Sequence, residues 1–216
     1  MDGAVPKYIF NTPLGSLETF VRVNGKIVEK EDIEVAEVRL SPVLEYSYKL
    51  HNGDGTVATE KKNCYGVHIR CATKKKIRQL TFECRWKSTS KITRGRPECD
   101  KGINALRWTE NGHTVLVGTE DADSLIDRMR RRDHISPGFR HCLEEITPEL
   151  DHLVFGYKDD GFIIRLTEIP ANESAQVFFT ITWGEHPEPE SEATWLLMYK
   201  LHEMAMSSLD STEKAW

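Results

Sequence analysis

The chain has 216 residues, of which 39% are hydrophobic and 29% charged, and its formal net charge is −5. A chain of this length and composition buries an ample core without disulfides or a metal, as globular proteins do. No run of 18 apolar residues occurs, and the first residues are not the basic and then apolar segment of a signal peptide. We therefore expect a cytoplasmic protein that neither crosses nor binds a membrane.

An alternation of apolar and polar residues with a period of two dominates the first half of the chain. Asn24-Gly25 and Asn111-Gly112 interrupt it, and Asn-Gly pairs favour the type I′ turn of a two-residue hairpin. Up to about residue 118 the pattern predicts an antiparallel meander. Its expected strands and hairpins are 17–28, 33–40, 43–50, 65–71 paired with 78–86, and 106–108 paired with 115–117.

Beyond residue 119 the apolar residues recur with a helical period as well. The pattern predicts helices over 121–132, 136–146 and 194–207, and strands over 152–157, 162–169 and 176–183. We therefore expect one α+β domain over residues 1–216, an antiparallel β-rich meander with two or three helices packed on it. A subdivision near residue 119 is the alternative, with a mainly β segment over residues 1–118 and a mixed segment of helices and strands over residues 119–216. Residues 208–216 are expected to form a frayed tail.

The cysteines and histidines predict neither a disulfide framework nor a metal site. The cysteine count is odd, and no two cysteines form a Cys-x-x-Cys pair. Four lie in or beside predicted strands, where a reduced cysteine acts as a small buried hydrophobe. No nucleotide-binding fingerprint or metal-ligand spacing occurs, so we expect no cofactor and no metal. The five cysteines are Cys64, Cys71, Cys84, Cys99 and Cys142.

The charges are segregated along the sequence. Residues 61–107 hold 14 Lys/Arg against 3 Asp/Glu, whereas residues 144–216 hold 4 against 15. Most of the basic residues fall at the two ends of the hairpin expected over 65–86, and the basic loop 87–101 has no aromatic side chain. A nucleic-acid groove requires cations that track the backbone and aromatic rings that stack on bases. We therefore expect no binding to nucleic acid.

The acidic segment 184–192 is the strongest candidate site. Pro187 and Pro189 exclude a regular helix or strand and hold this segment extended, so that its glutamates project from the surface. The alternative is structural: Ser191 caps the last helix, carboxylates favour the positive end of its dipole, and the neighbouring tryptophan packs in the core. The expected partner-binding residues are Glu185, Glu188, Glu190, Glu192 and Trp183.

In composition the chain resembles the immunity proteins with which bacteria neutralise a cognate toxin. This resemblance implies a non-enzymatic protein whose partner is a protein with a basic surface, such as a toxin or nuclease domain. No catalytic residue is predicted. The alternative function is an enzyme whose active site is assembled from residues distant in sequence, and the oligomeric state is left open. The residues considered for such a site are His68, His113, His141, Asp151, His152 and Glu168.

Overall fold

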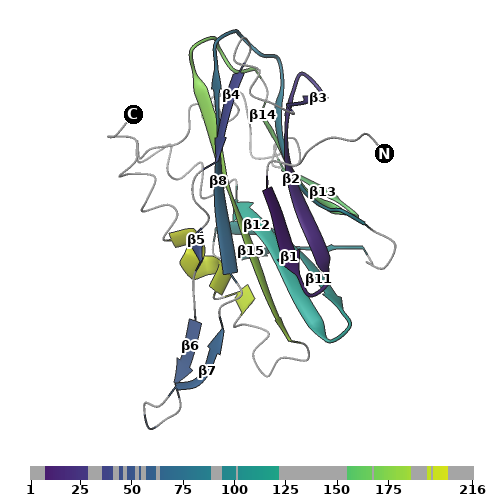
Figure 1. Ribbon diagram of the computed structural model, residues 1–216, viewed down its shortest axis with the longest axis vertical. Helices are drawn as coiled ribbons and strands as arrows, with labels where there is room; N and C mark the ends of the chain where they lie inside the picture. The colour runs from purple at the N-terminus through teal and green to yellow at the C-terminus, as the bar shows by residue number, and fades with distance from the viewer. Residues whose placement is uncertain are drawn as a thin grey trace.

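Two antiparallel sheets packed face to face form the body of the protein (Figure 1). The structure is a computed structural model. It describes residues 8–28, 36–40, 44–45, 48–51, 54, 57–61, 64–88, 94–100, 102–121, 155–166, 168–185, 194–195 and 197–203.

The first sheet, called sheet A, has the strand order β1-β2-β9-β14-β13, with the short β3 also paired to β2. All of its pairings are antiparallel. Its strands are β1 (Tyr8–Thr12), β2 (Gly15–Val23), β3 (Lys26–Ile27), β9 (Leu80–Trp86), β13 (Phe155–Lys158) and β14 (Gly161–Leu166).

The second sheet, called sheet B, has the order β10-β11-β12-β15-β8-β4, with β5 also paired to β8. A separate two-stranded ribbon, β6 (Tyr48–His51) and β7 (Val57–Lys61), projects from one end of the molecule (Figure 1). The strands of sheet B are β4 (Ala36–Leu40), β5 (Leu44–Glu45), β8 (Cys64–Thr73), β10 (Arg96–Asp100), β11 (Ile103–Glu110), β12 (His113–Glu120) and β15 (Ser174–Glu185).

The expected α+β fold with two or three helices is wrong. The described residues contain one short helix, at 194–195 and 197–203, and are otherwise mainly strands. The helix expected over 136–146 lies outside the described residues, and so does the helix expected over 121–132, apart from its first residue. The strands of the second half do not form a separate layer with helices, because β14 pairs with β9 in sheet A and β15 lies between β12 and β8 in sheet B. Both sheets therefore combine strands from before and after residue 119.

The hairpin expected from 65–71 and 78–86 is also wrong. β8 belongs to sheet B and β9 to sheet A, so the chain crosses between the sheets after Thr73. Alternation shows which side chains share a face, but it does not show which strand lies alongside. The basic loop expected over 87–101 is in part a strand, because Arg96–Asp100 forms β10.

The two Asn-Gly turns are confirmed. Asn24 and Gly25 have φ angles of 51° and 81°, and Asn111 and Gly112 have 49° and 73°. These left-handed values suit the central residues of a type I′ turn, which asparagine and glycine tolerate best. The turns close the β2–β3 and β11–β12 hairpins at the expected positions.

The main core fills the space between the two sheets. Val21 and Phe82 of sheet A belong to the same buried cluster as Leu106 and Phe179 of sheet B. A second, smaller cluster lies on the outer face of sheet B, where the C-terminal helix covers the strands (Figure 1). Its members are Ile103, Ala105, Leu116, Trp195 and Met198. Within the described residues, no helix has both the length and the apolar character needed to cross a membrane.

Candidate functional site

A row of charged and titratable side chains lies where three neighbouring strands of sheet B end. Glu110 of β11 is the register partner of His113 on β12, and His113 is in turn the partner of Glu185 on β15. Residues directly opposite each other in a sheet place their side chains on the same face. We call Glu110, His113 and Glu185 the acidic row. Glu185 is exposed, and the other two side chains are half-buried.

The acidic row lies at the rim of the sandwich, on the face of sheet B that bears the main core. Val115 and Trp183 follow His113 and Glu185 at a spacing of two residues, and both belong to the core cluster. Alternate residues of a strand share a face, so the row continues the core face out to the surface. The row therefore lies at the end of the sheet, where Glu185 is exposed to solvent.

Trp183 lies behind this row and is mostly buried. Its side chain is 9% exposed and stacks on Tyr65, with ring centroids 5.1 Å apart and an interplanar angle of 26°. Tyr65 in turn contacts Phe10 across the sandwich, with ring centroids 6.1 Å apart. This position favours the packing alternative for Trp183 over direct contact with a partner.

The structure describes only some of the acidic segment expected as a site. Glu185 is the last residue of β15 and therefore continues the strand instead of belonging to a loop. Glu188, Glu190 and Glu192, and the proposed cap Ser191, lie outside the described residues. Sequence reasoning missed the neighbours of Glu185, because Glu110 and His113 become adjacent to it only through strand pairing.

The residues considered for an enzyme site do not come together where they are described. Glu168 binds Lys76, with Nζ 2.5 Å from Oε1, near the start of β15, whereas His113 lies at its far end. The 12 residues of β15 span about 36 Å at roughly 3.3 Å per residue. The side chains of His68, His141, Asp151 and His152 lie outside the described residues. Within the described portion of the chain, no group of three His, Cys, Asp or Glu is placed to hold a metal ion.

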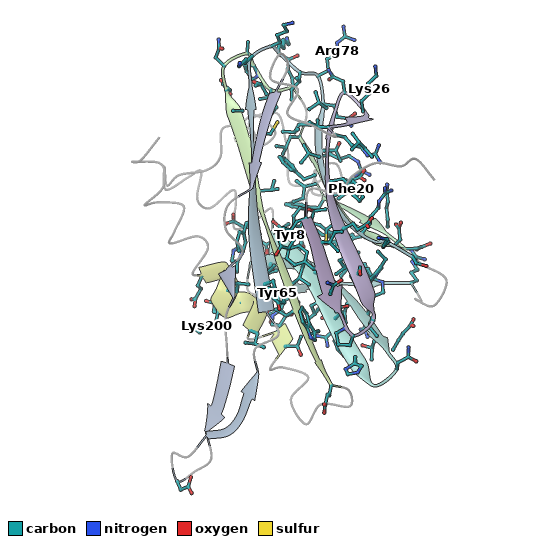
Figure 2. The ribbon with its side chains drawn as sticks, viewed as in Figure 1. Tyr8, Phe20, Lys26, Tyr65, Arg78 and Lys200 are labelled. Carbon is teal, nitrogen blue, oxygen red and sulfur yellow. The ribbon has the colours of Figure 1, made fainter. Side chains whose placement is uncertain are left out.

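Exposed cations gather at the opposite end of the molecule from the acidic row. We call Lys26, Lys74, Lys75 and Arg78 the basic end; all four are exposed, and Figure 2 shows Lys26 and Arg78 together at the top. Asn24 joins the two loops that carry them. Its Oδ1 accepts the backbone N–H groups of Arg78 and Gln79 at 2.9 and 3.2 Å, and its own N–H donates to the Gln79 carbonyl.

The second group of basic residues expected from the sequence is partly neutralised. Lys87 Nζ lies 3.5 Å from Glu18 Oε1, and Arg94 Nε lies 3.0 Å from Asp159 Oδ1. These pairs are solvent-exposed on the cation side and contribute little to stability. They do lower the positive charge around Lys87 and Arg94, whereas Lys74, Lys75 and Arg78 of the basic end are exposed.

A partly buried ion pair on the outer face of sheet A was not expected from the sequence. Glu83 is 5% exposed, and its Oε1 accepts a hydrogen bond of 2.9 Å from Arg22 Nε, while its Oε2 has no hydrogen-bond partner among the described residues. The Arg85 guanidinium lies 4.4 Å from the ring centroid of Phe20 on the neighbouring strand. A glutamate in a strand of alternating pattern usually faces solvent, and nothing in the sequence around it distinguishes Glu83.

The shifted pKa values in the described residues have structural causes. Hydrogen bonds from Lys200 and Tyr199 lower the pKa of Glu203 on the C-terminal helix, and the hydrogen bond to Glu203 raises the pKa of Tyr199. Burial raises the pKa of the Cys84 thiol. Glu203 is exposed on the helix surface and Cys84 is buried in the core, so the shifts follow from these local surroundings.

No protein-family model matches the chain, and no curated protein matches it. A solved structure with similarity to it is described as a "Putative kojibiose phosphorylase from human microbiome". The identity is 7% and the TM-score 0.45, over 88% of this chain. The match spans 25% of the length of that protein.

Proposed function

We propose that the protein is a non-enzymatic, cytoplasmic binding protein whose acidic row contacts a basic surface on a partner protein. The observation that carries this proposal is the alignment of Glu110, His113 and Glu185 across three adjacent strand ends. Strands that pair over most of their length hold these side chains in fixed positions. A fixed row loses less conformational entropy on binding than three independent side chains would.

Charge supports the same assignment. Glu110 and Glu185 give the row two carboxylates, and the sequence after it adds Glu188, Glu190 and Glu192 within seven residues of Glu185. Negative charge concentrated at one end of a protein increases the rate of encounter with a basic partner and orients it. The basic end lies at the other end of the same molecule, so it does not neutralise the acidic row.

The specific form of the proposal is inhibition of a partner that handles a polyanion. Such a partner, for example a toxin with nuclease activity, has cations around its active site, and an acidic surface that covers them blocks the substrate. Trp183 then contributes indirectly, because its stacking on Tyr65 holds the end of β15 against the core.

The test compares two variants with the same kind of charge change. Immobilised protein is exposed to native lysate at low salt, and the proteins it retains are identified by mass spectrometry. We expect a basic protein to bind the wild type and Asp100→Lys, but not the double variant Glu110→Lys/Glu185→Lys. Asp100 is an exposed residue of sheet B whose register partner, Ile103, is at the other end of β11 from Glu110. Equal retention by all three proteins would contradict the proposal.

A further inference from the structure

Sheet A ends in a described strand, β1, whose own sequence lacks the features that usually protect a sheet edge. Four strands end the described sheet orders: β1 and β13 in sheet A, and β10 and β4 in sheet B. An edge strand offers unpaired N–H and C=O groups to another chain, and proteins protect such edges with charges, proline or very short strands. The four edges differ in these respects, so they can be compared from their sequences.

Three of the four edges carry such protection. β10 contains Pro97 and three charged residues, and β4 contains Glu37 and Arg39. β13 has four residues and includes Gly156 and Lys158. These features disfavour pairing with a further strand.

β1 has none of these features. Its sequence, Tyr8-Ile9-Phe10-Asn11-Thr12, contains no charge, proline or glycine. Ile9 is 43% exposed and is the exposed large hydrophobic residue of the described portion of the chain. Figure 1 shows β1 at the border of its sheet, beside β2. The short strand β3 pairs with the last residues of β2, on the same side as β1. It carries a charge, Lys26.

β1 is also held firmly in place. All five of its residues pair with β2, and Phe10 is buried in the core. Side chains fix the turn between the strands: Ser16 Oγ donates to Asn11 Oδ1 at 2.9 Å, and Thr12 Oγ1 donates to the Gly15 carbonyl at 2.9 Å. Tyr8 packs against Phe10, with ring centroids 4.5 Å apart. A strand fixed in this way is a ready template for strand addition.

We propose that β1 pairs with β1 of a second copy of this chain, in antiparallel orientation about a two-fold axis. The strand is complementary to itself, because an antiparallel pairing of two uncharged copies brings no like charges together and covers Ile9 in both. The two copies of sheet A then form one continuous sheet. The acidic row lies in sheet B, so this surface is separate from the one proposed to bind a partner.

The dimer is weak, because five residues on each side bury far less than the roughly 1,600 Å² of a standard interface. Sedimentation velocity across a range of concentrations tests it. We expect the wild type to shift from monomer to dimer as concentration rises, whereas Ile9→Lys stays monomeric with an unchanged melting temperature. Ile9→Val keeps the edge apolar and should dimerise, and so should Gln79→Lys, which adds the same charge at the basic end.

Hydrogen exchange provides a second readout. Amides of residues 8–12 should become better protected at high concentration in the wild type and not in Ile9→Lys. A wild type that stays monomeric throughout, or a dimer that survives the Ile9→Lys change, would overturn the proposal. A third outcome is a monomeric wild type that binds a different protein, with this binding lost in Ile9→Lys. That result would exclude self-pairing and show that β1 pairs with a strand of another protein.

Discussion

Tyr65 and Trp183 stack between neighbouring strands of sheet B, with ring centroids 5.1 Å apart. The contact joins β8 to the end of β15, immediately behind Glu185. It therefore links the packing of the core to the position of the acidic row.

Trp183→Ala should destabilise the protein by about 3–5 kcal/mol, the usual cost of removing a large aromatic side chain from a core. Trp183→Phe retains a ring against Tyr65 and should cost clearly less. Chemical denaturation of the two variants and the wild type measures both values. A loss below about 1 kcal/mol in Trp183→Ala would mean that Trp183 is free to serve as an interface anchor.

The cysteines should differ sharply in reactivity. Cys71 and Cys84 are buried, and burial raises the pKa of Cys84, so little thiolate forms there; Cys99 is exposed. Because the thiolate is the reactive form, Cys99 should be alkylated first among these three in the folded protein. Mass spectrometry after timed treatment with iodoacetamide gives the order. Modification of Cys84 before Cys99 would contradict the described burial.

Turns and strands could be predicted from the sequence because their causes are local. Asn24-Gly25 and Asn111-Gly112 adopt left-handed φ angles, and few other residue pairs do so readily. The partners of strands without such a turn between them could not be predicted, because β8 and β9 show the same alternation whether they form a hairpin or belong to different sheets. The expected α+β class was wrong for a different reason, because the described residues hold one short helix and are otherwise mainly strands.

The candidate site was predictable only in some respects. Glu185 was selected because acidic residues follow it closely in the sequence. Its neighbouring strand was hidden, because His113 and Glu185 are separated by most of the second half of the chain and meet through the β12–β15 pairing. Glu83 was hidden for a similar reason, since its Arg22 partner comes from a strand 61 residues away.

The basic end should not bind nucleic acid at physiological salt. It offers four exposed cations and, among the described residues, no aromatic ring beside them, so at most about four phosphate contacts form. At roughly 0.9 per contact, the slope of log affinity against log salt should be no steeper than about −3.6. Fluorescence anisotropy with duplex and single-stranded DNA tests this, with Lys75→Glu/Arg78→Glu as the control. A micromolar affinity at about 0.15 M salt would contradict it.

On the C-terminal helix, replacing Lys200 should change the pKa of Glu203 measurably. Since Lys200 and Tyr199 lower the pKa of Glu203, the carboxylate stabilises the folded state above its ordinary pKa, and this contribution is lost as pH falls through the lowered value. Lys200→Met removes the largest cause, so the pKa of Glu203 should rise toward its ordinary range. An NMR titration of the side-chain carboxyl measures the shift. An unchanged titration midpoint would mean that the Lys200 contact does not persist in solution.

The association rate of the partner retained from lysate tests the central claim most directly. Exposed charges act mainly on encounter, so Glu110→Lys/Glu185→Lys should slow association tenfold or more at about 0.02 M salt, and the difference should shrink at about 0.5 M. Asp100→Lys should remain within about twofold of the wild type under the same conditions. Stopped-flow mixing of the partner with each variant gives these rates. An association rate unchanged by the double substitution at low salt would show that the acidic row is not the binding surface.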